Sequence, residues 1–174
     1  MPLPVRFCIR YVSPRSRPLT LAESTVRRIA YGLKIPTPEA IQAAAPGMAE
    51  LLEEGPCWLI PIPASCGSSE ANLALCQAIR KFHPMARIVI GIRRTHPVDS
   101  SCVRRRSGLM GLTMKQHSFQ RCCPPLLRLP VWFVDNVVTT GTTLKAAHHA
   151  FGTGYGLVYA DASSCALIRH PSRK

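Results

Sequence analysis

The stretch VWFVDNVVTTGTTLKAA, residues 131–147, places a carboxylate shortly before a run of threonine and glycine residues. Its apolar start is typical of a buried strand and its end of a helix, so Asp135 is expected at the carboxyl end of a strand and TTGTT in the strand-to-helix loop. Free backbone N–H groups and the positive end of a helix favour an anion in such a loop. Gly141 allows the backbone to approach a ligand closely, and the threonine hydroxyls add donors.

A carboxylate next to an anion-binding loop is a suitable pair for a sugar phosphate. A phosphate in the loop would lie several ångströms from Asp135, roughly the width of a sugar, and a carboxylate accepts hydrogen bonds from vicinal hydroxyls. The same residues also allow a structural interpretation, in which a core strand ends in an Asp turn and threonine caps the following helix.

Residues 131–143 resemble the PRPP-binding motif of type I phosphoribosyltransferases, where PRPP is 5-phosphoribosyl 1-diphosphate. That motif has four apolar residues, two usually acidic residues, two apolar residues and a small-residue phosphate loop. The resemblance implies that Asp135 and Asn136 face the ribose 2′- and 3′-hydroxyls. It implies a 5-phosphate site made of Thr139, Thr140, Gly141, Thr142 and Thr143.

The resemblance also implies an activity: transfer of the 5-phosphoribosyl group from PRPP to a nitrogen nucleophile, such as a nucleobase, with release of diphosphate. Mg²⁺ is the implied cofactor, held mainly by PRPP itself, and Asp135 is the one candidate protein ligand. Mg²⁺ keeps waters and needs few protein ligands, so the small number of acidic residues is compatible with this role. Dimers are common in the family, which makes a homodimer an expectation.

A looser resemblance covers WLIPIPASCGSSEANLALCQAI, which occupies the place of the family's strand, diphosphate-binding loop and helix. Backbone amides at the start of a helix are suitable donors for a diphosphate. The residues implied are Ala64, Ser65, Cys66, Gly67 and Ser68. An ordinary strand-to-helix loop is the alternative, and Cys66 is interpreted as a small loop residue rather than a nucleophile.

The segment RRTHPVDSSCVRRRSGLMGLTMKQHSF falls where these enzymes carry a mobile hood. Together with YGLK and IPIP it is most similar to competence protein F-like phosphoribosyltransferases, although the cysteine-rich zinc element with which those proteins often begin is not found in this sequence. The basic residues that would close over diphosphate are Arg93, Arg94, Arg104, Arg105 and Arg106. A solvated basic face is the alternative.

Two positions depart from the family pattern. Asn136 stands where the second acidic residue is usual, which removes a negative charge near the cation that develops during transfer. Thr139 stands where purine-salvage members often carry an acidic general base, and a threonine hydroxyl does not accept a proton at neutral pH. These departures weaken a purine-salvage assignment and keep open a non-catalytic protein that binds PRPP or a nucleotide.

The composition favours one domain over residues 1–174, with an N-terminal segment 1–55 and a core 56–165 that includes the basic hood 93–130. No apolar run approaches the roughly 20 residues that span a bilayer, and no secretory signal is recognisable, so no membrane association and a cytoplasmic location are expected. The eight cysteines form no C-x-x-C pair, which favours reduced thiols.

The chain carries 22 lysines and arginines against 9 acidic residues. Such a charge attracts polyanions and does not by itself distinguish a polyphosphate substrate from nucleic acid. A nucleic-acid-associated protein is therefore a third hypothesis, although no helix-turn-helix, zinc finger or aromatic stacking platform is recognisable.

Buried strands alternate with helices along the chain, which predicts an α/β fold with a doubly wound, mainly parallel sheet and helices on both faces. A helix is expected after Thr20 with a capping box to Glu23, and a second helix after Thr37 should break or kink at Pro46 and Gly47. The remaining expected elements are strands at 6–12, 57–63, 86–92, 131–135 and 157–163 and helices at 70–82 and 143–151.

Overall fold

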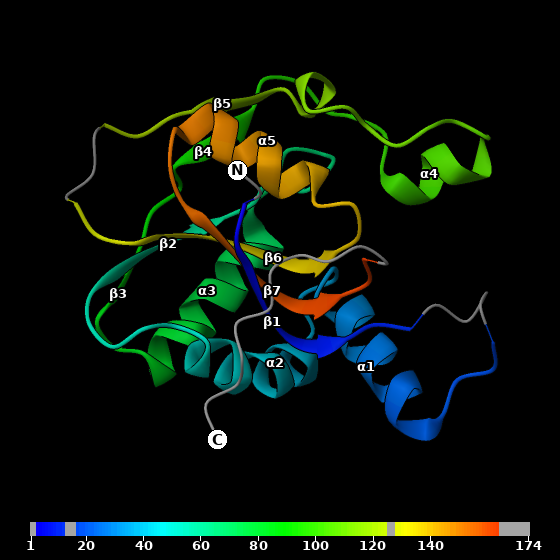
Figure 1. Cartoon of the computed structure of the whole chain (residues 1–174), viewed down its shortest axis with the longest axis horizontal. Coiled ribbons are helices and arrows are strands. Elements are labelled where there is room, and N and C mark those ends of the chain that lie inside the picture. The colour runs from blue at the N-terminus through cyan, green and yellow to red at the C-terminus, as the bar shows by residue number, and fades with distance from the viewer. Residues whose placement is uncertain (1–2, 13–16, 125–127, 164–174) are drawn as a thin grey trace.

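Five parallel strands form the central sheet, in the order β1-β7-β6-β2-β3 (Figure 1). The structure is a computed structural model that describes residues 3–12, 17–124 and 128–163. The strands of this sheet are β1 Val5–Arg10, β2 Cys57–Pro61, β3 Ala86–Ile88, β6 Val131–Val138 and β7 Tyr155–Asp161. A parallel sheet covered on both faces buries both sets of side chains, which is why β2, β6 and β7 read as nearly continuous apolar runs.

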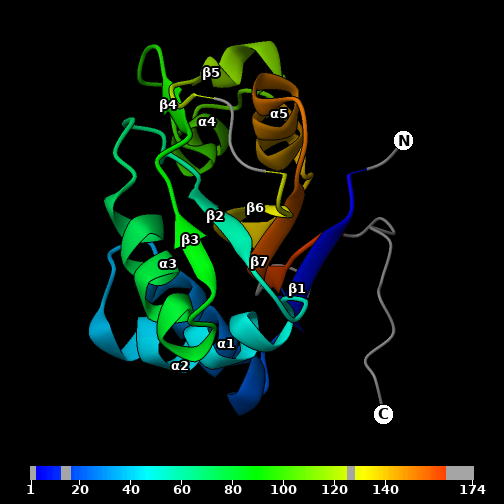
Figure 2. The same cartoon turned by 90° about the vertical axis from the view of Figure 1, so that its left-hand side faces the viewer.

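Helices cover both faces of the sheet (Figure 2). On one face lie α1 Leu21–Gly32, α2 Pro38–Glu50 and α3 Glu70–Phe82, which share a buried cluster with β2, β6 and β7. On the other face α5 Thr142–Phe151 packs in a second cluster with residues of β1, β2 and β6. The predicted α/β class with a parallel sheet and helices on both faces is confirmed.

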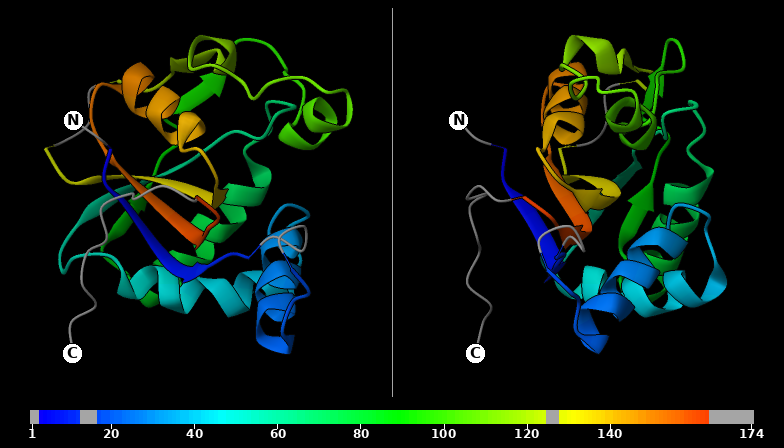
Figure 3. Two further views of the ribbon diagram at one scale, coloured as in Figure 1. Left: turned by 45° about the vertical axis from the view of Figure 1, so that its right-hand side comes forward. Right: turned by 90° about the vertical axis from the view of Figure 1, so that its right-hand side faces the viewer.

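The basic segment 93–130 contains a small second sheet. Strand β4 Ile92–Arg94 pairs antiparallel with β5 Phe119–Arg121, and this hairpin packs on α5. Between them lie α4 Ser101–Arg106 and the 3₁₀ turn η1 Lys115–His117. Figure 3 shows α4 projecting away from the central sheet at the end of a long connection.

The predicted capping box of α1 is confirmed. The Thr20 hydroxyl accepts a hydrogen bond from the Glu23 N–H at 3.2 Å, and the Glu23 carboxylate accepts one from the Thr20 N–H at 2.9 Å. Of the predicted break or kink in the second helix, the break is wrong, because α2 runs without interruption through Pro46. Four residues of α2 are buried against the sheet and the neighbouring helices, so tertiary packing maintains a helix that local propensity disfavours.

The predicted single strand at 86–92 is also wrong, because the chain leaves the sheet after Val89 and starts β4 at Ile92. Gly91 passes so close to the α5 side that an added Cβ would lie 3.0 Å from a Phe151 ring carbon and 3.1 Å from the Ile60 side chain. The apolar residues of 86–92 are therefore divided between the central sheet, through β3, and the small second sheet, through β4.

Two strand ends differ from the prediction at the place where β2 and β6 separate. β2 ends at Pro61, whereas β6 continues three residues beyond Asp135 because β7 still pairs with it as far as Val138. Asp135 thus lies at the residue where β6 loses its partner on the β2 side.

Among the described helices, none combines the length and apolar character needed to cross a membrane. The six cysteines whose side chains the structure describes are free thiols, as predicted: Cys8, Cys57, Cys66, Cys76, Cys122 and Cys123.

Candidate functional site

The sheet has a topological switch point between β2 and β6. From β2 the chain passes through α3 to β3 on one side, and from β6 it passes through α5 to β7 on the other side. In open parallel sheets, ligands bind in the crevice beyond the carboxyl ends of the strands at such a point. The two loops singled out from the sequence, 64–68 and 139–143, follow these two adjacent parallel strands and so leave the sheet at the same edge.

Asp135 is half-buried at this edge. Its Oδ1 accepts hydrogen bonds from the Asn136 N–H at 2.8 Å and from the Asn72 side-chain amide at 3.4 Å. Burial raises the pKa of Asp135 above its ordinary value, and these two hydrogen bonds and the charges of Lys34 and Arg94 oppose the increase. The opposing contributions all favour the ionised form.

The side-chain oxygen Oδ1 of Asn136 accepts a hydrogen bond from the backbone N–H of the next residue, Val137, at 2.8 Å. The NH₂ group of the amide is consequently the part that can meet a ligand, and it donates hydrogen bonds rather than accepting them. The acidic residue usual at this position could only accept.

The 139–143 loop turns sharply into α5. Gly141, the N-cap residue of α5, has a φ of 73° and no side chain that could cap the helix, and the Thr140 hydroxyl accepts a hydrogen bond from the Thr142 N–H at 3.4 Å. Thr139 and Thr140 are exposed, and the hydroxyls of Thr140 and Thr142 lie 2.8 Å apart. The first turn of α5 thus presents backbone N–H groups and hydroxyls at its positive end, as an anion site requires.

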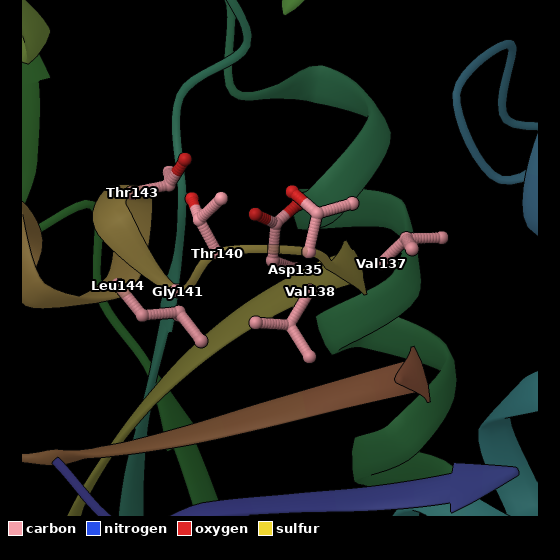
Figure 4. Close-up of a pocket in the computed structure, with 8 residues that line it drawn as sticks. Asp135, Val137, Val138, Thr140, Gly141, Thr143 and Leu144 are labelled. Carbon is pink, nitrogen blue, oxygen red and sulfur yellow. The ribbon is translucent and has the colours of Figure 1, made fainter. Parts of the chain in front are cut away.

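A small pocket joins this loop to the carboxylate. It is lined by Asp135, Val137, Val138, Thr139, Thr140, Gly141, Thr143 and Leu144. Figure 4 shows the side-chain oxygens of Asp135, Thr140 and Thr143 on one side of the pocket and the side chains of Val138 and Leu144 on the other. The structure therefore brings Asp135 into one pocket with Thr139, Thr140, Gly141 and Thr143, whereas Asn136 and Thr142 of the predicted set are not among the lining residues.

The 64–68 loop uses part of its backbone internally. The Ala64 N–H donates to the Ser68 carbonyl at 2.8 Å, and the Gly67 N–H donates to the Ala64 carbonyl at 3.0 Å. No hydrogen bond from the described residues occupies the N–H groups of Ser65, Cys66 and Ser68. Of the predicted donors for a diphosphate, these three are available, and the exposed Cys66 lies in the loop as expected.

Arg94 fixes the hood to this loop. Its Nε donates to the Ala64 carbonyl at 2.7 Å, a second guanidinium nitrogen donates to the His117 carbonyl, and the group lies 4.4 Å from the centre of the Phe119 ring. A further hydrogen bond, from the Val98 N–H to the Ser65 carbonyl at 2.9 Å, joins the same two segments. Arg94 is thus a structural clamp that also contributes positive charge near Asp135.

The other basic residues of the hood are separated from this clamp. Arg93 is exposed and bonds Gln120 across the hairpin at 3.1 Å. On the projecting α4, Arg104 bonds the Met110 carbonyl at 2.7 Å and Arg106 is exposed. The Arg105 side chain lies outside the described part of the structure. Neither Arg104 nor Arg106 lines the pocket.

Sequence reasoning missed two residues near Asp135. Asn72 is 9 % exposed and lies on the buried face of α3, three residues before Leu75 and seven before Ile79. A polar residue at this helical spacing was the available signal, because a buried amide needs partners. Lys34 follows α1, and nothing in its local sequence relates it to Asp135.

A scan of the chain against protein-family models gives no match, and a search of curated proteins gives no significant match. The interpretation of the site therefore rests on its geometry and on the sequence pattern.

Proposed function

We propose that the chain is a type I phosphoribosyltransferase-like protein that binds PRPP with Mg²⁺ and transfers the 5-phosphoribosyl group to a nitrogen nucleophile. The observation that carries the proposal is the position of Asp135, at the switch point between β2 and β6 and in one pocket with the 139–143 loop. A carboxylate, an anion-binding helix start and a second loop on the adjacent strand match the three parts of PRPP: ribose hydroxyls, 5-phosphate and diphosphate.

Each part of the site has a distinct role in this proposal. The first turn of α5 and the hydroxyls around Gly141 bind the 5-phosphate. Asp135 accepts a hydrogen bond from one ribose hydroxyl, and the Asn136 NH₂ group donates to the oxygen of the other. The free N–H groups of Ser65, Cys66 and Ser68 donate to the diphosphate.

The residues present fit Mg²⁺ that is bound largely by substrate. The described part of the chain contains no group of three or more metal-ligating side chains, but Mg²⁺ commonly takes one carboxylate together with substrate phosphates and waters. Asp135 is the carboxylate at hand, and its Oδ2 makes no hydrogen bond to the described residues. When bound, the ion would neutralise charge on the leaving diphosphate.

In the transfer, the lone pair of the acceptor nitrogen forms a bond to C1 of the ribose. The bond from C1 to the diphosphate oxygen breaks and its electron pair leaves with the diphosphate. An N–H acceptor then gives its proton to water or to the diphosphate, because Thr139 is no base. Positioning of the two reactants and stabilisation of the developing cation by Asp135 supply the catalysis.

Calorimetric titration of PRPP with and without Mg²⁺ tests the site. We expect micromolar, Mg²⁺-dependent binding that Asp135→Ala abolishes while the urea unfolding curve shows a folded protein. Candidate nucleobases and amines are then screened by diphosphate release. Equal PRPP affinity in Asp135→Ala would contradict the proposal.

A non-catalytic PRPP-binding protein is the second candidate, and Asn136 is the residue that favours it. With one acidic residue instead of two, the site has less negative charge to stabilise a cation at C1, whereas an amide still binds a hydroxyl. This candidate predicts the same calorimetric result with no diphosphate release for any acceptor. Asn136→Asp should then produce measurable diphosphate release if charge is what the site lacks.

A further inference from the structure

The hydrogen-bonded ladder between β2 and β6 opens immediately beside Asp135. Along the paired part, the Ile62 N–H donates to the Val134 carbonyl at 3.0 Å. The parallel register makes the bond from the Asn136 N–H to the Ile62 carbonyl the next one in the ladder. This ladder bond to the Ile62 carbonyl does not form, because the Asn136 N–H donates to Asp135 Oδ1 instead.

Asn72 supplies the donor that the opened ladder lacks. Its Nδ2 donates to the Ile62 carbonyl at 2.8 Å and to Asp135 Oδ1 at 3.4 Å. A buried carbonyl without a donor costs about 1–3 kcal/mol, so a side-chain amide is needed where the strands part. Both neighbours of Nδ2 are acceptors, which assigns the NH₂ end of the amide to this position.

The contacts leave the Asp135 carboxylate with two different oxygens. Oδ1 is held by the Asn136 N–H and by Asn72, whereas no hydrogen bond from the described residues engages Oδ2. Two donors on one oxygen restrict rotation of the carboxylate and leave the other oxygen for a ligand in the pocket that Asp135 lines.

We propose that Asn72 is a positioning residue for Asp135: it holds the switch point open and fixes the carboxylate toward the ribose hydroxyls. Asn72 belongs to α3, the helix that follows the 64–68 loop, so it also ties the diphosphate side of the site to the ribose side. This inference rests on the proposed function, because it assigns Asn72 a role in binding PRPP.

A double-mutant cycle on PRPP binding tests the role. Binding with Mg²⁺ is measured for the unaltered protein, Asn72→Leu, Asp135→Asn and the double variant. Leucine matches asparagine approximately in size but donates no hydrogen bond. Asn72→Ser, which keeps a donor at smaller volume, is the second variant in case Asn72→Leu does not fold. Cys76→Ala is the matched control, because Cys76 is buried on the same face of α3, four residues further along.

We expect Asn72→Leu to weaken PRPP binding about tenfold or more, Asn72→Ser to weaken it less, and Cys76→Ala to leave it unchanged. Because Asn72 acts through Asp135, adding Asn72→Leu to Asp135→Asn should cause little further loss. Urea unfolding of every variant shows that the folded protein is being compared.

Three results would overturn the inference in different ways. Unchanged binding in Asn72→Leu alongside weakened binding in Asp135→Asn would remove the positioning role and leave the proposed function intact. Losses that add fully in the double variant would show that Asn72 affects binding independently of Asp135 and does not position it. If the unaltered, folded protein does not bind PRPP, the proposed function fails and this role fails with it.

Discussion

At the scale of single residues, Gly141 determines how closely the 139–143 loop can hold an anion. Its φ of 73° lies in the left-handed region that favours glycine, whereas the nearest atom to an added Cβ is 3.9 Å away on Val138. The glycine is therefore required for its backbone conformation and not for space. A methyl group would be tolerated sterically but would penalise the conformation that turns the first N–H groups of α5 toward the pocket.

Gly141→Ala is predicted to lower the free energy of unfolding by about 1–2 kcal/mol and to weaken binding of ribose 5-phosphate. Urea unfolding and calorimetry measure the two effects. Gly152→Ala is the matched control, because Gly152 ends the same helix with a φ of 94° and no atoms within 4 Å of an added Cβ. It should show the loss of stability without the loss of affinity. Equal loss of affinity in both variants would contradict a role of the loop in binding phosphate.

At the scale of elements, the hood is attached to the core through buried polar groups. His117 on η1 is 5 % exposed, stacks on Phe119 with ring centres 5.5 Å apart, and places Nδ1 3.5 Å from the Arg94 guanidinium. Burial, and secondly the charge of Arg94, lowers the pKa of His117 from 6.5 to about 4. The imidazole is thus neutral in the folded protein at neutral pH.

This histidine should make stability depend on pH. Between pH 6.5 and 4 the unfolded chain binds a proton at His117 that the folded chain does not. The folded state therefore has its full stability above pH 6.5 and loses stability as the pH falls toward 4. The loss in the free energy of unfolding amounts to at most about 3 kcal/mol. His117→Gln should flatten the dependence measured by urea unfolding across this range. His149→Gln, at an exposed position of α5, should keep it. An unchanged slope in His117→Gln would contradict the assignment.

Local patterns predicted the elements that local interactions form. The apolar runs at β2 and β6, the capping box at Thr20 and the strand-to-helix loop at Gly141 are all readable within a few residues. The errors occur where distant residues decide. The split of the 86–92 run depends on Gly91 meeting Phe151, and the contact of Asn72 with Asp135 joins residues 63 apart in sequence. Such contacts depend on which strands become neighbours, and the sequence pattern contains no direct signal for that.

At the scale of the whole molecule, the formal net charge of +13 attracts polyanions of every kind. In the structure, some of the basic residues are bonded to other parts of the protein. Arg94 and Arg121 each lie over an aromatic ring, at 4.4 and 4.3 Å from its centre, and bond backbone carbonyls of the hood and its surroundings. These two arginines of the basic segment are engaged within the protein, whereas Arg93 and Arg106 are exposed, so the charge distribution alone does not choose between a small polyphosphate and nucleic acid.

Ligand-induced stabilisation distinguishes the two kinds of polyanion. PRPP with Mg²⁺ at one hundred times its dissociation constant should stabilise the folded state by about 2.7 kcal/mol, which corresponds to a rise in Tm of roughly 5–11 °C for a chain of 174 residues. The rise should be absent in Asp135→Ala. A duplex DNA fragment should cause little change at 200 mM salt, because binding that depends on phosphate contacts alone weakens steeply as salt is raised. If DNA stabilised the protein at that salt concentration and PRPP did not, the basic segment rather than the switch point would be the binding surface. Asp135 would then have only a structural role at the edge of the sheet, and its pocket would not be a ligand-binding site.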